Sequence, residues 1–403
     1  MNDLERLRSI QVADVYKAGR KAAQLVRTQH GTEFTYLHDY LDDGIAVATT
    51  MPLTSVTRHT VAGSVPPFFA GLLPEGRRLF GLQRMVKTSA DDEFSILLAV
   101  GRDPIGDVRV VPEGDQPGEI EPLVVVEQSF DEVRFSELLS DTGVFDKVAI
   151  PGVQDKVSAG MISVPVAAAG HRYILKIDSP EYPHVVANEF YFINVARSAG
   201  IPVVNAQVVH DALGRDGLLI QRVDRVSDAN GGAIALASED ACQLLDRWPG
   251  DKYNVTSEQV AHAIVNVCEA GVVAARDVLR QICFAWLSGN GDVHAKNISV
   301  ISDLSGERRV APAYDLASTL FYRDLSLALS IGGKTTGLSR RGLLDFAASI
   351  GLNEKAGSRI LDGVLYGTAS LTRDLREGVL PFDQNTVSGA VRELEYRRRQ
   401  LAT

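Results

Sequence analysis

Four polar side chains of different chemistry lie within six positions of the segment GNGDVHAKNISV (residues 289–300). They are an acid (Asp292), an imidazole (His294), an amine (Lys296) and a carboxamide (Asn297). On a helix, the spacing of Asp292 and Asn297 would place them on different faces, but in a loop both side chains can converge on one point. Their oxygens are hard ligands suited to Mg²⁺. The alternative interpretation is a polar turn between two buried elements.

The catalytic loop of protein kinases also has an aspartate followed five residues later by an asparagine. The aspartate accepts the proton of the substrate hydroxyl, and the asparagine holds a metal ion. This spacing predicts the same two roles for Asp292 and Asn297. A second metal-binding acid is then required, and Asp315 follows a β-prone run in RRVAPAYDLAST, immediately before a possible helix start. The alternative role for Asp315 is that of a helix cap.

A lysine for the nucleotide phosphates should come earlier, on a strand. Lys176 lies among apolar residues in RYILKIDSP and could reach phosphate as a point charge, or lie on the exposed face of its strand. Glu189, in the following predicted helix, could pair with it, or could serve as a cap or lie on a solvated face. The segment AIPGVQDKVSAG (residues 149–160) is not a Walker A sequence but could present backbone N–H groups to phosphate.

The bulk composition indicates a cytoplasmic protein. The 403 residues suffice for two or three domains or lobes, and the formal net charge of −10 argues against wholesale coating of nucleic acid. The three cysteines are widely spaced, which fits a reducing compartment rather than a disulfide framework or zinc cluster. The first residues do not resemble a signal peptide, and no apolar stretch is long enough to span a membrane.

The order of predicted elements divides the chain into four parts. Residues 1–112 mix short β-prone runs, including residues 44–51, with helical stretches that break at Pro74 to Gly76. Residues 113–126 are rich in Pro, Gly and acid and form a predicted linker. Residues 127–235 form a β-rich lobe that contains a helix ending near Gly200. Residues 236–403 are mainly helical, apart from the opening motif and a hairpin over residues 300–315.

Seven segments resemble, in order, the core motifs of the HipA family of bacterial serine/threonine kinase toxins: PGVQDKVSA, YILKID, NEFYF, LLIQRVDR, EDACQ, GNGDVHAKN and PAYDL. The N-terminal segments VADVYKAGR, PPFFAGLLPEGRR and VGRDPIGDVRVVP resemble the accessory subdomain of the same family. The resemblance implies an α+β, protein-kinase-like bilobal fold with a β-rich N-lobe, a helical C-lobe and an additional HipA-type N-terminal subdomain.

The resemblance also implies roles for individual residues, with ATP and Mg²⁺ as cofactors. Asp292 matches the catalytic aspartate, and Lys296 is placed to neutralise the charge of the transferred phosphate. Asn297 and Asp315 match the Mg²⁺ ligands. The implied ATP-binding residues are Lys176, Gln221, Val223, Asp224, His294, Gly152, Val153 and Gln154. For His294, bracing of the loop by hydrogen bonding is the alternative to contact with the nucleotide.

The implied partners are a HipB-like helix-turn-helix antitoxin, operator DNA bound through the antitoxin complex, and a protein substrate such as an aminoacyl-tRNA synthetase. The implied activity is that of a serine/threonine kinase toxin that is also a co-repressor. Two alternatives are a small-molecule kinase, since aminoglycoside and choline kinases carry a similar GDxHxxN loop, and a catalytically weak, DNA-bound co-repressor. The accessory subdomain and the GVQDKVS segment argue against the first, and the intact polar residues against the second.

Position 149 predicts a difference in regulation. In the resembled family, a serine just before the phosphate-binding turn is autophosphorylated, which adds negative charge and ejects the loop. Aligning the turn on Gly152 puts Ala149 at that position. Incubation with Mg-ATP should therefore leave residues 149–154 without phosphate, whereas Ala149→Ser should restore a phosphorylation site, as measured by mass spectrometry. Phosphate on Ser158 or Thr142 together with lost activity would show that the brake has moved to another residue.

Overall fold

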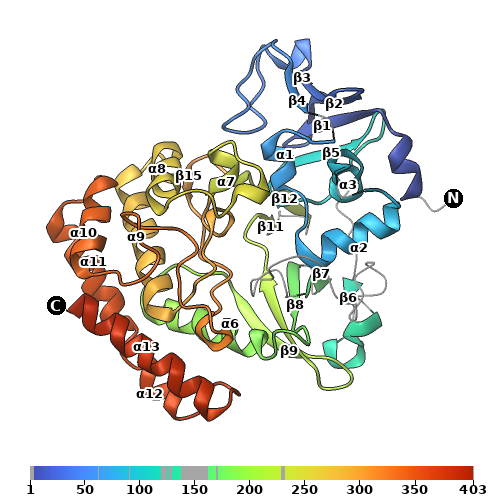
Figure 1. Cartoon of the computed structure of the whole chain (residues 1–403). Helices are drawn as coiled ribbons and strands as arrows, with labels where there is room; N and C mark the ends of the chain where they lie inside the picture. The colour runs from blue at the N-terminus through green and yellow to red at the C-terminus, as the bar shows by residue number, and fades with distance from the viewer. Residues whose placement is uncertain are drawn as a thin grey trace.

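The computed structural model describes residues 4–61, 63–89, 91–118, 125–126, 129–137, 162–168, 171–227 and 232–402. Three regions follow one another along the chain: an N-terminal sheet with its helices, a second sheet, and a large helical region that carries the C-terminus (Figure 1). The predicted phosphate-binding segment, including Ala149, Gly152, Val153 and Gln154, lies outside the described residues.

The N-terminal region is an antiparallel sheet packed against short helices. Its strands, in the spatial order β4-β3-β2-β1-β5, are β1 (Val12–Lys17), β2 (Arg20–Thr28), β3 (Gly31–Tyr36), β4 (Arg58–Val61) and β5 (Val108–Pro112). Its helical elements are η1 (Glu5–Ser9), η2 (His38–Tyr40), α1 (Pro67–Gly71), α2 (Gly76–Val86) and α3 (Glu93–Val100). The gap between α1 and α2 confirms the predicted break, because Pro74 cannot continue a helix. Residues 44–51 form only an isolated bridge between Ala48 and Met51, and not the predicted strand.

The second sheet contributes residues to one wall of the candidate active site. Its strands, in the order β6-β7-β8-β10-β9, are β6 (Val125–Val126), β7 (Ile162–Ala168), β8 (His171–Ile177), β9 (Ala206–His210) and β10 (Asp216–Gln221). The last two residues of the predicted linker form β6, which pairs parallel to β7. Helix α6 (Val185–Ser198) packs against this sheet through buried side chains such as Phe192, and Gly200 follows it with a φ of 73°, as predicted for a helix end. A short 3-10 turn, η3 (Phe130–Glu132), and the β11 (Arg225–Ser227) and β12 (Ala233–Ala235) ribbon complete the region.

The helical region surrounds a small sheet of β13 (Ser238–Asp240), β14 (Ser299–Ser302) and β15 (Arg308–Val310). Its α-helices are α7 (Ala241–Leu244), α8 (Ser257–Val267), α9 (Gly271–Ser288), α10 (Arg340–Ser349), α11 (Glu354–Gly367), α12 (Leu371–Arg376) and α13 (Gln384–Ala402). Its 3-10 turns are η4 (Pro249–Asp251), η5 (Ala295–Asn297) and η6 (Leu320–Tyr322). Helix α9 lies buried at the centre of the helical region. The guanidinium of Arg397, in α13, lies 4.1 Å from the ring centre of Trp286, in α9. Pairing of β14 with β15 confirms the predicted hairpin.

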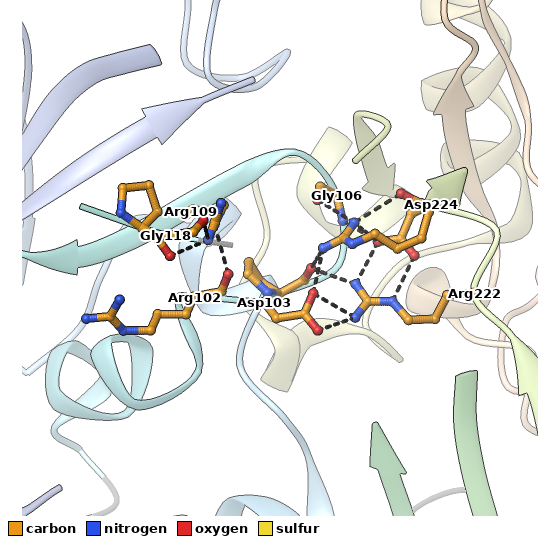
Figure 2. A network of polar contacts seen from close by, with 10 residues as sticks. Arg102, Asp103, Gly106, Arg109, Gly118, Arg222 and Asp224 are labelled. Carbon is orange, nitrogen blue, oxygen red and sulfur yellow. Dashed lines mark hydrogen bonds and ion pairs between the residues drawn. The ribbon is translucent and has the colours of Figure 1, made fainter. Parts of the chain in front are cut away.

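A buried cluster of arginine and aspartate side chains fastens the N-terminal region to the second sheet (Figure 2). Asp103, which follows α3, accepts hydrogen bonds from Arg222 at 2.9 Å and Arg225 at 2.8 Å. Asp224 accepts from the same two arginines, at 3.0 and 2.7 Å, and from the backbone N–H of Gly106 at 2.9 Å. The two arginine side chains are only 3% and 2% exposed, so their charges depend on these carboxylates.

Among the described residues, no helix combines the length and apolar character that crossing a bilayer requires.

Removing one carboxylate of the cluster should destabilise the contact between the two regions. We expect Asp103→Asn to lower the free energy of unfolding by about 2 to 4 kcal/mol, because two buried guanidinium groups lose one of the two carboxylates that they share. Asp246→Asn is the matched control, since it breaks the more exposed ion pair with Arg58 and should cost less than about 1 kcal/mol. Urea denaturation followed by circular dichroism measures the free energy of unfolding of both variants. An equal decrease in the two variants would contradict a stabilising role for the buried arginine–aspartate cluster.

Candidate active site

All three regions contribute to a cavity of about 410 Å³. The N-terminal region lines it with Glu75, which precedes α2, and the second sheet with Lys176 and Val223. The helical region lines it with Asp292 and Asp315. The polar residues that the sequence singled out at distant positions therefore share one enclosed space.

The ammonium group of Lys176 joins two acidic side chains in this cavity. Its Nζ lies 2.8 Å from Oε1 and 3.0 Å from Oε2 of Glu189 in α6, and it also contacts the carboxylate of Asp315. The predicted Lys176–Glu189 pair is confirmed. Lys176 is buried, so the alternative of an exposed strand lysine is wrong, and Glu189 is buried too, which excludes a solvated face.

Burial and charge act against one another in this trio. Although burial opposes ionisation, the carboxylates of Asp315 and Glu189 raise the pKa of Lys176, so it stays protonated. Burial and the nearby Asp315 raise the pKa of Glu189, whereas for Asp315 the ammonium of Lys176 outweighs burial and lowers the pKa. One ammonium faces two carboxylates, which leaves an excess negative charge whenever both are ionised. Such a place favours an additional cation.

Asp315 is held in a turn and caps no helix. Its φ of 54° lies in the left-handed region, which non-glycine residues seldom adopt and which costs about 1 kcal/mol or more. The next described element after Asp315 is the 3-10 turn η6, which begins at Leu320, so the predicted helix start immediately after Asp315 is wrong. Oδ2 of Asp315 accepts a hydrogen bond of 2.9 Å from Nδ2 of Asn297, and its backbone carbonyl accepts one of 2.8 Å from Nδ2 of Asn290. Asp315 and Asn297 are therefore neighbours, as the sequence predicted for two ligands of one metal.

The side chains of Asn297 and Asp315 fit a Mg²⁺ ion. Both supply hard oxygen atoms beside the excess negative charge, and Mg²⁺ commonly binds one or two protein oxygens together with waters and substrate phosphates. Among the described residues, no group of three or more His, Cys, Asp or Glu side chains is arranged to hold a metal ion.

Asp292 follows the end of α9 in a tightly fixed loop. Its Oδ1 accepts a hydrogen bond of 2.9 Å from the hydroxyl of Tyr253, and its backbone N–H donates to Oδ1 of Asn290 at 3.0 Å. The N–H of Gly291 donates to the hydroxyl of Thr319 at 2.9 Å, and a Cβ on Gly291 would lie 2.3 Å from a backbone oxygen. The motif does connect two buried elements, α9 and β14, as the alternative of a polar turn proposed, and these contacts also place the buried carboxylate of Asp292 in the lining of the cavity.

His294 is buried behind the loop and lines the cavity. Its backbone N–H donates to Oδ1 of Asn297 at 3.1 Å, and its ring packs edge-on against Tyr253 with 5.1 Å between the ring centres. Burial, and then the charge of Lys252, lower the pKa of His294 to about 3, so the imidazole is neutral at physiological pH. This contact belongs to the backbone, and the buried Nδ1 of the ring has no hydrogen-bond partner within the described part of the chain. Bracing of the loop by the imidazole and contact with a nucleotide therefore both stay predictions.

Lys296 reaches across to the N-terminal region. Its Nζ lies 2.7 Å from Oε1 of Glu75 and 3.2 Å from the carbonyl oxygen of Gly71. The other oxygen of Glu75 contacts Lys252. Although burial acts in the opposite direction, these two lysines lower the pKa of Glu75 to about 2, so the carboxylate is ionised near neutral pH.

The three residues predicted for the nucleoside, Gln221, Val223 and Asp224, line one end of the cavity. The side chain of Gln221 accepts a hydrogen bond of 3.1 Å from Asn205. The carboxylate of Asp224 is engaged by Arg222 and Arg225, as described above (Figure 2). The roles of all three in binding ATP stay predictions.

The lining or supporting residues that were not singled out from the sequence include Glu75, Arg78, Lys252, Tyr253 and Asn290. The only sequence signal for Glu75 and Arg78 was their place at the predicted break in PPFFAGLLPEGRR. Asn290 lies inside the GNGDVHAKN motif, in which only Asp292, His294, Lys296 and Asn297 were predicted to have roles. Lys252 and Tyr253 carried no signal, because their contacts join segments far apart in the chain.

Comparison with known families gives matches over most of the chain. Residues 148–370 match the model of the HipA-like C-terminal domain, and residues 13–111 match that of the HipA N-terminal domain. A Sinorhizobium fredii protein described as "Putative kinase" is 31% identical over 86% of this chain and 87% of its own length. The serine/threonine-protein kinase toxin HipA of Shewanella oneidensis is 27% identical over 73% of this chain and 72% of its own length.

The fold is also found among solved structures. The complex of HipA, HipB and operator DNA from Shewanella oneidensis contains a chain that matches with a TM-score of 0.77 and 21% identity, covering 97% of both chains. This likeness, with the two sheets and the helical region described above, confirms the predicted α+β, kinase-like bilobal fold.

The contact between Asp315 and its neighbours predicts a metal-dependent effect. We expect Asp315→Asn to lower the affinity for Mg-ATP by roughly tenfold or more, because a charged hard ligand is lost, and to lower the affinity for metal-free ATP much less. Asparagine suits this test because it tolerates the left-handed backbone of Asp315. Asp303→Asn, in the exposed turn between β14 and β15, is the control. Calorimetry that shows unchanged Mg-ATP affinity in Asp315→Asn would count against the metal site.

Proposed function

The chain belongs to the HipA family of kinases, and from this premise we propose that it is an ATP- and Mg²⁺-dependent serine/threonine protein kinase. The observation that carries the proposal is the convergence of Lys176, Asn297, Asp315 and Asp292 on one cavity. Each has the chemistry that phosphoryl transfer requires, and their supporting contacts come from three separate regions of the chain.

Asp292 is proposed to accept the proton of the acceptor hydroxyl. The acceptor oxygen then forms a bond to the γ-phosphorus as the bond from that phosphorus to the β–γ bridging oxygen breaks, which leaves ADP. The hydroxyl of Tyr253 donates to Oδ1 of this carboxylate and so helps to orient it. Positioning of this kind accounts for much of the rate enhancement in phosphoryl transfer.

Lys176 is proposed to bind the phosphates of ATP as a point charge. Its pairing with Glu189 fixes the ammonium at the end of β8, as the corresponding lysine–glutamate pair does in protein kinases. Asn297 and Asp315 would hold Mg²⁺, which would offset the negative charge of the phosphates. Lys296 supplies a further positive charge for the transferred group.

Toxin activity and antitoxin binding are proposed on the strength of the relatives. One relative bears the name of a serine/threonine-protein kinase toxin, and the matched structure is a complex of HipA with HipB and operator DNA. We propose that this chain likewise binds a HipB-like helix-turn-helix antitoxin in the cytoplasm and reaches operator DNA through it. Its acceptor would be a protein, with aminoacyl-tRNA synthetases as the first class to test.

Two other functions suggested by the loop motif predict different outcomes. A small-molecule kinase would consume ATP with an aminoglycoside or choline as acceptor, and a catalytically weak co-repressor would transfer no phosphate at all. The N-terminal region lines one side of the cavity with Glu75 and Arg78. Its presence supports a protein kinase of the HipA type over a small-molecule kinase. The ion cluster of Lys176, Glu189 and Asp315 supports a kinase over a catalytically weak co-repressor.

Asp292→Asn tests the proposed chemistry. The substitution removes the base but keeps the side-chain volume, so phosphate transfer should fall by about 100-fold or more while ATP affinity stays within about threefold. Transfer of label from γ-labelled ATP to a target aminoacyl-tRNA synthetase, with calorimetry of nucleotide binding alongside, measures the two quantities. Full activity in Asp292→Asn would exclude this residue as the catalytic base.

A further inference from the structure

The N-terminal region supplies the counter-ion of the catalytic loop. Glu75 precedes α2 in a region that is otherwise separate from the loop, and its carboxylate spans the ammonium groups of Lys296 and Lys252. The second contact of Lys296, the carbonyl of Gly71, also belongs to the N-terminal region. Both polar contacts recorded for Nζ of Lys296 thus come from outside the two kinase-like lobes.

The two lysines are buried enough to need this partner. Their side chains are only 13% and 12% exposed, whereas that of Glu75 is 35% exposed. Burying ammonium groups close together is costly unless an anion compensates them. Glu75 supplies that charge, and its position at the edge of the cavity leaves it partly open to solvent.

Because of where Lys296 lies, its contact with Glu75 does more than hold the two regions together. Lys296 lies in η5, between the proposed base Asp292 and the proposed metal ligand Asn297, and lines the same cavity as both. A long lysine side chain has many rotamers, and a charged group contributes to catalysis only when it is fixed before the reaction. The carboxylate of Glu75 and the carbonyl of Gly71 hold the ammonium in one position.

We propose that Glu75 is a positioning residue that acts through Lys296, so that the N-terminal region completes the active site. The proposal rests on the proposed kinase function. Glu75 touches no reacting atom; it fixes the charge that faces the transferred phosphate. A kinase-like core of this chain without its N-terminal region would therefore keep Lys176 and Asp292 but lose control of Lys296.

The test compares charge with shape at position 75 in the full-length chain. Glu75→Gln keeps the shape and removes the charge, and should lower kcat by roughly 10- to 100-fold with KM for ATP within about threefold. Glu75→Asp keeps the charge and should retain more turnover than Glu75→Gln. Asp246→Asn, which breaks an ion pair between the same region and the helical region away from the catalytic loop, should leave kcat unchanged.

A double-mutant cycle separates positioning from a general structural role. In a Lys296→Met background, Glu75→Gln should cause no further loss, because the residue through which Glu75 acts is already gone. Independent, multiplicative losses would overturn the proposal. A rise in turnover on Glu75→Gln would also overturn it, since Glu75 would then be a block on Lys296.

A second measurement does not depend on turnover. Brief acetylation of the folded protein with acetic anhydride, followed by mass spectrometry, reports how well each lysine is protected. Lys296 should be modified several times faster in Glu75→Gln than in the wild type or in Asp246→Asn, and equal rates in all three would refute the contact. If the wild type transfers no phosphate to any acceptor, the proposed function fails, while this labelling still decides whether Glu75 holds Lys296.

Discussion

The ammonium group of Lys176, buried between the carboxylates of Glu189 and Asp315, is the interaction on which the rest of the site depends. It joins β8, α6 and the turn at residue 315, three segments that belong to two different lobes. Loss of the Lys176 charge would leave two neighbouring carboxylates without their shared cation, which is among the costliest changes in a protein interior. The strained backbone of Asp315 is tolerated because its side chain and its carbonyl are both held, by Lys176 and Asn297 and by Asn290.

The N-terminal region contacts the other regions in two places at the site. In one of them, Asp103 binds Arg222 and Arg225, which are sequence neighbours of the residues predicted to bind ATP (Figure 2). In the other, Glu75 binds Lys296 in the catalytic loop. Both contacts are ionic and largely buried, so the position of this region is linked to the shape of the whole cavity. A partner that moved it would alter nucleotide contacts and the catalytic loop together.

Local signals explain what could be predicted from the sequence. The spacing of Asp292 and Asn297 and the apolar strand around Lys176 lie within short segments, and the structure brings these residues together. The break at Pro74 follows from proline chemistry alone. Glu75 and Tyr253 could not be assigned, because their partners lie in other regions and only tertiary packing brings them within reach. The predicted helix after Asp315 was wrong because the left-handed turn at that residue redirects the chain. In residues 44–51, β-prone composition gave no strand because β propensity depends strongly on the neighbours available for pairing.

The central claim is that this cavity binds Mg-ATP with its γ-phosphate facing Asp292. A crystal structure of the full-length chain with Mg²⁺ and a non-hydrolysable ATP analogue tests it most directly. The account predicts the phosphates beside Lys176, the metal ion bound by Asn297 and Asp315, and the nucleoside against Gln221 and Val223. A nucleotide bound outside the cavity, or one whose phosphates point away from Lys176 and Asp292, would contradict it.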